Sequence, residues 1–462
     1  MKLLPTYLAD ARAAQPLYHP IDAPNGALQL GVAENYMMQE HLTTELTKLQ
    51  QNINFDASQI YYQPTQGRVG TRRAMTRLFN RILTRKYNFD ENCMIIGAGC
   101  NAVLENLAIC LAEAGDSVLI PTPYYAAFEF DLVARAGLKI QPVTTLDHNN
   151  EYEHVNNVSA KASSTTEVPV HMYYPNKSAL DAAYEQSVIE HGSTPRILLL
   201  SSPNNPLGVC YPAHVIQECV DWAEERGVHV ISDEIYAGSV YRTPRNSDDD
   251  NDNNDIVPWT SIAELAASND QKLGPHVHIV YAMSKDFALS GLRVGAVYTE
   301  NEDIAVPLQK LNDLCQISSQ TQVMVEHMLD PELNGGWADT FLVESQEHLK
   351  RRCGEVEQCL EELGIPFLAG GAGLFLWMDF QEFLPELDGA DEDGGQEVQA
   401  QRERALYLEL LHEHGLLFTP GLSMKTELPG FFRFVFTAAT EDEFQVALDR
   451  IRVFAKSKRS KN

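Results

Sequence analysis

Long apolar runs are missing from this chain. No stretch reaches the ~18 consecutive apolar residues that are needed to cross a bilayer. The beginning, MKLLPTYLADARAAQ, is interrupted by Pro5 and Asp10, so it does not have the continuous apolar centre of a secretion signal. The sequence therefore predicts no contact with a membrane, and we expect a cytoplasmic protein.

Basic residues are also few. The 462 residues contain 35 Lys and Arg against 64 Asp and Glu, which leaves a formal net charge of −29. Binding to nucleic acid requires a basic surface that replaces the counterions of the phosphates, so nucleic acid is excluded as a partner. Part of the negative charge lies in the segments 246–255 and 385–396, which we expect to be surface loops, as we do the polar segment 144–170.

The eight cysteines have no pattern of a metal or redox site. None of them forms a C-x-x-C pair, which disfavours a structural zinc site and a thioredoxin-like centre. We expect reduced thiols and no bound metal.

What the chain does contain is enough apolar residues, 44%, for a large core, and a regular alternation of short apolar strands with helices. Strands without polar alternation predict a mostly parallel sheet that is covered by helices on both faces, an α/β fold. The expected strands lie at 94–97, 117–123, 139–143, 196–203, 229–235 and 278–284. The expected helices up to that point lie at 39–52, 70–86, 101–114, 126–136, 178–190 and 212–226.

From about residue 301 the pattern changes to long helices, expected at 303–328 and 336–362, and to strands at 373–380 and 431–437. Helices at 397–414 and from 440 complete a smaller α+β domain. We therefore expect a large domain over 60–320 and a small domain over 321–462, with the segment 1–59 contributing to the small domain.

Polar side chains follow several strands of the predicted sheet, where ligands bind in open parallel sheets. Asn205 follows one strand, Asp233 and Tyr236 lie at the end of the next, and Lys285 follows a third. Singly, each has an ordinary explanation as a turn residue, a helix cap or a solvated lysine. Together they offer a lysine for an imine, a carboxylate for a pyridine nitrogen, and Asn and Tyr donors for a phenolate oxygen, which is what pyridoxal phosphate requires.

A phosphate needs backbone N–H groups at a helix N-terminus and a nearby cation. Gly99, Cys100 and Asn101 open a predicted helix directly after a strand, and Arg293 in GLRVG can supply the charge.

The chain resembles a known family at these same positions. The segments SSPNNPLG, ISDEIY and AMSKDFALSGLRVG look like the signature blocks of fold-type I pyridoxal-phosphate enzymes, the class I/II aminotransferase family. The segments LGVAENYM, DSVLIPTPYYAAFEFDL, GGAGLFLWMDF and FFRFVF resemble 1-aminocyclopropane-1-carboxylate synthases and their aminotransferase-like relatives. The resemblance covers roughly residues 28–450 and implies a fold-type I fold.

The resemblance also implies roles for single residues. Lys285 would form the internal aldimine and then move the substrate α-proton, while Asp233 would pair with the pyridinium nitrogen and stabilise the quinonoid carbanion. Asn205 and Tyr236 would donate hydrogen bonds to the phenolate oxygen, and Tyr125 would stack on the ring. Ser284, directly before the lysine, also counts as cofactor-binding.

Two further residues would contact the substrate. Arg433 in FFRF would bind the α-carboxylate with its planar fork, and Glu34 in GVAEN matches a glutamate that reaches the active site in the cyclopropane-forming branch.

The chain departs from the family pattern near the phosphate. Ala282 stands where the family usually has a phosphate-binding serine, and Cys100 and Asn101 replace the common small residue and threonine. The family also sends a tyrosine across a dimer interface to the partner's phosphate. Tyr62 fits this role by its spacing to Gly67, and the resemblance therefore implies a homodimer with shared active sites.

We expect an enzyme that acts on an α-amino acid, with transamination as the first reading. The alternative is a synthase-like lyase that expels a β- or γ-leaving group from S-adenosylmethionine or a cysteine conjugate, and Glu34 favours this branch. No second arginine points to a distal carboxylate, so an acidic substrate is not favoured.

Two readings from other classes are weaker. Residues 97–102 satisfy a dinucleotide fingerprint, but the acidic residue about 20 positions later is missing. A binding protein without catalysis would have no physical reason to keep Lys285 together with its electronic partners.

Overall fold

The computed structural model describes residues 7–13, 16–54, 56–145, 169–242, 256–268, 272–386 and 395–461. The three predicted surface loops, at 144–170, 246–255 and 385–396, lie largely outside the described residues.

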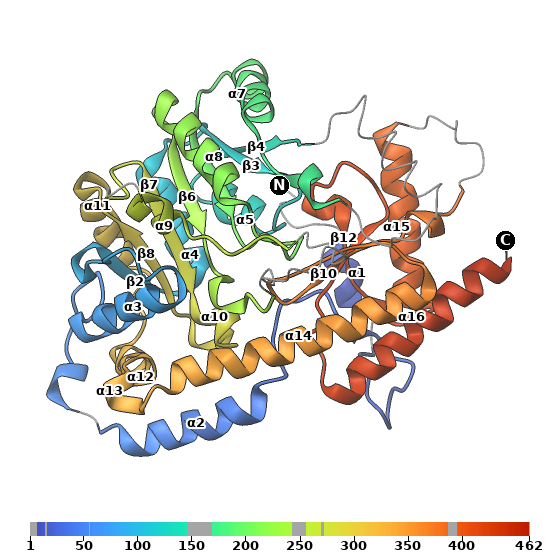
Figure 1. Cartoon of the computed structure of the whole chain (residues 1–462), viewed down its shortest axis with the longest axis horizontal. Helices are drawn as coiled ribbons and strands as arrows, with labels where there is room; N and C mark the ends of the chain where they lie inside the picture. The colour runs from blue at the N-terminus through green and yellow to red at the C-terminus, as the bar shows by residue number, and fades with distance from the viewer. Residues whose placement is uncertain are drawn as a thin grey trace, which may run out of the picture.

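A sheet of seven strands forms the centre of the molecule, in the order β2-β8-β7-β6-β5-β3-β4 (Figure 1). The pairs from β7 to β4 are all parallel, and only β8 runs antiparallel to both of its neighbours. The strands are β2 (Met94–Gly97), β3 (Ser117–Pro121), β4 (Lys139–Val143), β5 (Pro195–Ser201), β6 (His229–Asp233), β7 (Val277–Ala282) and β8 (Gly295–Thr299). The predicted mostly parallel sheet is confirmed.

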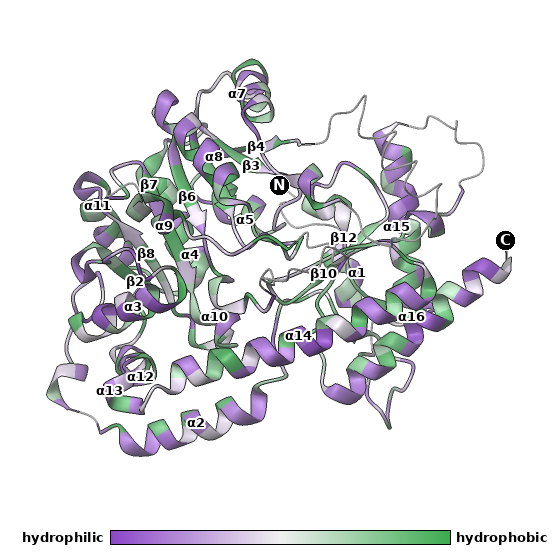
Figure 2. Ribbon diagram, viewed as in Figure 1, coloured by the Kyte–Doolittle hydropathy of each residue, from purple (hydrophilic) through white to green (hydrophobic). Residues whose placement is uncertain are grey.

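Both faces of the sheet are buried, which explains why its strands are apolar throughout. In β5, Leu198 and Leu200 point to one hydrophobic core and Ile197 and Leu199 to another, as the two-residue period of a strand requires. Figure 2 shows hydrophobic residues along the central strands, whereas the outer helix α2 (Gln39–Asn52) is mostly hydrophilic.

Each face is covered by its own set of helices. The first core contains side chains of α3 (Val69–Ile82), α7 (Lys177–His191), α8 (Ala213–Arg226), α9 (Ile262–Ser268) and α12 (Ser319–Leu329). The core on the other face contains side chains of α4 (Gly99–Leu111), α5 (Phe128–Val133) and α11 (Glu302–Asn312).

The helix predicted over 303–328 is wrong as a single element, because α11 ends at Asn312 and α12 begins at Ser319. The side-chain amide of Asn312 donates to the carbonyl oxygens of Thr65 and Ile96, which fixes the end of α11 against another part of the chain. Ser318 then caps α12 by accepting a hydrogen bond from the backbone N–H of Thr321.

A second, smaller α+β unit has an antiparallel sheet of four short strands in the order β12-β13-β10-β9. Segments from the first and the last parts of the chain meet here, since β1 (Leu28–Gln29) pairs in parallel with β11 (Leu416–Leu417). The other elements are β9 (Phe367–Leu368), β10 (Leu376–Asp379), β12 (Thr419–Pro420), β13 (Phe431–Phe434), α15 (Gln396–His412) and α16 (Glu441–Lys461), with α1 (Tyr7–Ala13) beside α15.

The long helix α14 (Trp337–Leu363) runs along both units (Figure 1). Ala338, Phe341 and Leu342 belong to the first core, and the buried apolar residues of α14 from Leu349 onward belong to the core of the smaller unit. The division of the chain at residues 60 and 320 stays a prediction. No helix among the described residues is long and apolar enough to span a membrane.

Candidate active site

A cavity of about 340 Å³ lies at the carboxyl ends of β5, β6 and β7, where the two units meet. This volume is within the range of sites for small molecules. All predicted site residues except Gly99 and Tyr62 line it, namely Glu34, Cys100, Asn101, Tyr125, Asn205, Asp233, Tyr236, Ser284, Lys285, Arg293 and Arg433.

Lys285 lies on α10 (Met283–Asp286), the short helix that begins directly after β7. Its ammonium group donates a hydrogen bond of 2.7 Å to the carbonyl oxygen of Ala33. Burial lowers the pKa of Lys285 to about 8, although the nearby Glu34 carboxylate acts in the opposite direction. A lowered pKa increases the fraction of neutral amine, which is the nucleophilic form.

Asp233 ends β6 and is buried, with 5% of its surface exposed. Burial raises its pKa to about 7. Among the described residues, the one hydrogen bond to its carboxylate comes from the backbone N–H of Ile235, at 3.3 Å. A buried carboxylate with a single weak donor fits a protonated ring nitrogen, which would supply both a donor and a positive charge.

The first turn of α4 fits a phosphate. The helix begins at Gly99, whose φ of +87° favours glycine, and its first N–H groups have no partners inside the helix. A Cβ atom on Gly99 would lie 2.4 Å from a guanidinium nitrogen of Arg293, so the glycine lets this cation approach the helix end. The side-chain amide of Asn101 donates to Asp131 at 2.7 Å, so the group of this residue that can bind an anion is its backbone N–H in the first turn of α4.

Arg433, on β13, lines the cavity and is buried, with 3% of its surface exposed. Its guanidinium donates to the side-chain oxygen of Asn205 at 2.6 Å, to the carbonyl oxygen of Gly31 at 2.7 Å and to the hydroxyl of Thr419 at 3.2 Å. It also lies over the ring of Phe375, 5.3 Å from its centre. No carboxylate pairs with this arginine in the described part of the chain, so it fits the carboxylate of a ligand.

Two tyrosines add aromatic surface and a hydroxyl donor. Tyr236 is buried, which holds its pKa well above the ordinary value, and its ring packs edge-on against Phe375. Burial raises the pKa of Tyr125 to about 12. Both phenols therefore stay protonated at neutral pH, and Tyr236 can donate a hydrogen bond to an anionic oxygen.

Glu34 reaches the cavity from the segment that follows β1. The hydroxyl of Ser290 donates its one proton to the Glu34 carboxylate, with the hydroxyl oxygen 2.8 and 2.9 Å from the two carboxylate oxygens. The backbone oxygen of Glu34 accepts from the hydroxyl of Thr437. The segment therefore brings an acidic group close to Lys285.

Sequence reasoning missed other residues of the cavity, among them Tyr7, Asp131 and Ser290. Burial raises the pKa of Tyr7 even though Arg433 is close, and Asp131 is a second buried carboxyl whose pKa is raised to about 6. The signal for Asp131 was its position in an apolar helix six residues after Tyr125, where a surface acid is not expected.

Tyr62 does not line the cavity of its own chain. It is fully exposed, and Ile60 and Tyr61 beside it are each 72% exposed. Its predicted contact with a partner's phosphate stays a prediction.

Three comparisons relate the chain to known proteins. The profile of a family described as aminotransferase class I and II matches residues 26–451. The 1-aminocyclopropane-1-carboxylate synthase 5 of Oryza sativa subsp. japonica is 31% identical to this chain over 447 residues. The match covers 95% of this chain and 75% of the synthase. The synthase CMA101 of Cucurbita maxima is 30% identical over 450 residues, 96% of this chain and 85% of that one.

Solved structures show the same fold. Aspartate aminotransferase from Thermotoga maritima superposes with a TM-score of 0.70 at 19% identity and covers 98% of both chains. The aromatic aminotransferase from Pyrococcus horikoshii OT3 superposes with a TM-score of 0.69 at 19% identity, over 94% of this chain and 96% of that one. The predicted fold-type I architecture is thereby confirmed, and the chain belongs to the class I and II aminotransferase family of enzymes, whose cofactor is pyridoxal 5'-phosphate.

Proposed function

We propose that the cavity binds pyridoxal 5'-phosphate together with an α-amino acid and that Lys285 moves the α-proton of this substrate. The observation that carries the proposal is that three features surround one cavity. These are Lys285, the buried Asp233 with its one weak hydrogen bond, and the first turn of α4 with Arg293 beside it. The cofactor, when bound, supplies an aldehyde for the amine and an electron-withdrawing ring that weakens the bonds of the α-carbon.

The chain's own groups then have separate tasks. The first turn of α4 and Arg293 hold the phosphate, and Asp233 keeps the ring nitrogen protonated. The side-chain oxygen of Asn205 is engaged by Arg433, so the amide nitrogen is left to donate to the ring oxygen beside Tyr236. Arg433 fixes the substrate α-carboxylate.

Lys285 is well placed to carry the proton. Its amine is held by the carbonyl oxygen of Ala33, and its pKa of about 8 makes the neutral form accessible near physiological pH. Cavity-lining Lys and Arg residues in the described part of the chain are Lys285, Arg293 and Arg433. No further cation is thus left for a distal carboxylate, which supports a substrate without an acidic side chain.

For the step after proton removal, we place elimination of a β- or γ-leaving group first, as in the cyclopropane-forming synthases. Glu34 supports this branch because its carboxylate lies in the cavity close to Lys285, held by Ser290. The relatives that are about 30% identical carry the name of these synthases. Transamination, the first reading from the sequence, remains compatible with the family.

The test is to incubate the holoenzyme with S-adenosylmethionine, a cysteine conjugate and a panel of neutral amino acids, and to analyse both products and cofactor. Elimination predicts that a leaving group accumulates over many turnovers while the cofactor stays in its aldehyde form. If the cofactor instead converts to its amine form and a keto acid restores it, the enzyme is an aminotransferase and the elimination proposal is wrong.

We also propose a homodimer with shared sites. The exposed apolar segment of Ile60, Tyr61 and Tyr62 supports this, because a solvated surface rarely keeps three such side chains together. Lys285→Ala and Tyr62→Ala variants should each be inactive alone, and mixed subunits should recover about a quarter of the wild-type activity if one site uses both chains. No recovery would contradict sharing.

A cytoplasmic location is proposed as well. All eight cysteines are free thiols, and Cys210, Cys219, Cys353 and Cys359 are buried. Unpaired cysteines are typical of a reducing compartment.

A further inference from the structure

We propose that Arg352, which lies outside the cavity, is a positioning residue for Glu34 and acts through the turn that follows β13. This inference rests on the proposed function, in which Glu34 takes part in the reaction. It assigns a role in the active site to a residue that belongs to the core of the smaller unit.

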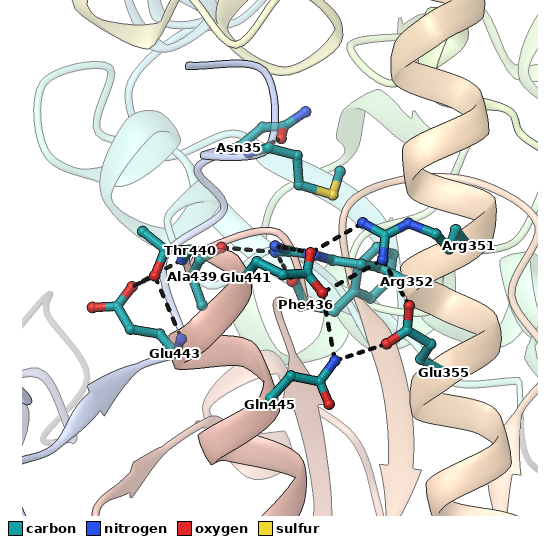
Figure 3. Close-up of polar contacts among 11 residues, drawn as sticks. Asn35, Arg351, Arg352, Glu355, Phe436, Ala439, Thr440, Glu441, Glu443 and Gln445 are labelled. Atoms are coloured by element: carbon teal, nitrogen blue, oxygen red, sulfur yellow. Dashed lines mark hydrogen bonds and ion pairs between the residues drawn. The ribbon is translucent and has the colours of Figure 1, made fainter. Parts of the chain in front are cut away.

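Arg352 is a buried arginine in the middle of α14, with 2% of its surface exposed. Its guanidinium donates to the carbonyl oxygens of Phe436, at 3.1 Å, and Ala439, at 2.7 Å (Figure 3). It also pairs with Glu441 at 3.2 Å and lies 4.8 Å from the centre of the Phe444 ring. One guanidinium nitrogen thus holds both ends of the turn from 436 to 439, while the second nitrogen of the planar fork pairs with Glu441.

The same turn holds the segment that carries Glu34. The hydroxyl of Thr437 donates to the carbonyl oxygen of Glu34, and the carbonyl oxygen of Thr437 accepts from the backbone N–H of Tyr36 at 3.0 Å. The backbone N–H of Val435 donates to the carbonyl oxygen of Leu30 at 2.9 Å. Glu34 is therefore fixed on its backbone side by the chain that Arg352 fixes.

The other side of the segment faces the reaction centre. Ser290 donates to the Glu34 carboxylate, and Lys285 donates to the carbonyl oxygen of Ala33. If the turn relaxes, the Glu34 carboxylate is displaced together with its backbone, whereas the long Lys285 side chain can follow the carbonyl group of Ala33. A contact outside the cavity therefore sets the position of the Glu34 carboxylate inside it.

The neighbouring Arg351 shows what Arg352 adds. Arg351 pairs with the same Glu441, at 3.0 Å, and with Glu355 at 2.8 Å, but its side chain is 48% exposed. Its described hydrogen bonds do not reach the carbonyl groups of the turn. Arg351→Met is thus a matched control that removes a cation from the same acid without releasing the turn.

The test combines Arg352→Met, Arg352→Lys and Thr437→Val with the control, all as holoenzymes. Arg352→Met and Thr437→Val should lower kcat about 10- to 100-fold, the range in which misplaced groups reduce rates. Their KM and affinity for pyridoxal phosphate should stay within about twofold of wild type, since Arg433 and the phosphate site are not touched. The kcat of Arg352→Lys should lie between those of wild type and Arg352→Met, and the kcat of Arg351→Met should match that of wild type.

A double variant separates positioning from general destabilisation. If Arg352 acts through Glu34, adding Arg352→Met to Glu34→Gln should cause little further loss of kcat. A full additional loss in the double variant, or an equal loss in Arg351→Met, would overturn the proposal. Should Arg352→Met fail to fold, Thr437→Val gives the same comparison, because it removes one hydroxyl with little change in shape.

A readout that does not depend on activity separates this proposal from the proposed function. Hydrogen exchange of the peptide containing Tyr36 should become faster in Arg352→Met and Thr437→Val but not in Arg351→Met, because the Tyr36 amide is bonded to Thr437. If exchange is faster in Arg352→Met but Glu34→Gln is fully active, Glu34 has no part in the reaction, although the link from Arg352 to its segment is real. Unchanged exchange would refute the link itself.

Discussion

Replacing Gly99 by alanine tests the phosphate site most directly. The new Cβ atom would lie 2.4 Å from one guanidinium nitrogen of Arg293 and 2.8 Å from its central carbon. Both separations are far below normal contact, so the end of the Arg293 side chain must move away from the first turn of α4. The positive φ of this position adds backbone strain of about 1–2 kcal/mol for any residue with a Cβ.

The displacement of Arg293 should weaken the binding of pyridoxal phosphate. A hydrogen bond to a charged group contributes about 1.5–3 kcal/mol, which corresponds to a rise of the cofactor Kd of roughly 10- to 150-fold. The assay is a titration of the cofactor-free enzyme with pyridoxal phosphate, followed by its absorbance. Denaturant unfolding of the cofactor-free protein measures the strain separately.

Gly115→Ala is the matched control. Gly115 has a φ of +99°, but no atom lies within 4 Å of the position of a new Cβ. It should show a comparable loss of stability and an unchanged cofactor Kd. Equal cofactor affinities in wild type and both variants would refute the placement of the phosphate at this helix end.

Two predictions concern pH. The rate at which the cofactor-free enzyme reacts with pyridoxal phosphate should rise with pH with a midpoint near the Lys285 pKa of about 8 rather than near 10.5, since only the neutral amine attacks. In Glu34→Gln this midpoint should move to lower pH, because the Glu34 carboxylate raises the pKa of Lys285. A midpoint that stays in place would contradict the coupling of the two groups. The second prediction concerns His278, whose pKa is lowered to about 3 by burial and by the neighbouring His229. Below pH 6.5 the His278 imidazole therefore binds a proton in the unfolded chain but not in the native state. The stability of wild type relative to His278→Val should therefore fall by about 2 kcal/mol between pH 7 and pH 5 in denaturant unfolding, and a difference that does not depend on pH would show that His278 is not the group responsible.

The sequence was most informative where local pattern and burial agree. The strands 94–97 and 139–143 and the helix 39–52 were predicted with the bounds that the structure has, because each is a short run between clear turn signals. The strand β8 was not predicted, since it begins at the last glycine of GLRVG and no turn residue separates it from that motif. The break between α11 and α12 depends on Asn312 bonding to Thr65 and Ile96, contacts that no local pattern contains.

In the candidate site, too, some residues could be predicted from the local sequence and others depend on distant contacts. Lys285, Asp233 and Asn205 were found because they follow strands whose ends must meet in a parallel sheet. Tyr7 lies far away in the sequence and reaches the cavity only because α1 is held against α15, where Arg404 donates to Asp10 at 2.6 and 3.1 Å. Such a contact depends on tertiary packing, which spacing along the chain does not encode.

The sharing of α14 between two hydrophobic cores has a consequence for how the protein unfolds. Phe341 completes one core and Val356 the other, and the same uninterrupted backbone connects them. Melting either core removes support from the helix that the other core packs against, so the two should lose their structure in one cooperative transition. A fragment cut at either end of α14 would expose an incomplete core, and the enzyme cannot be divided there into parts that are stable alone.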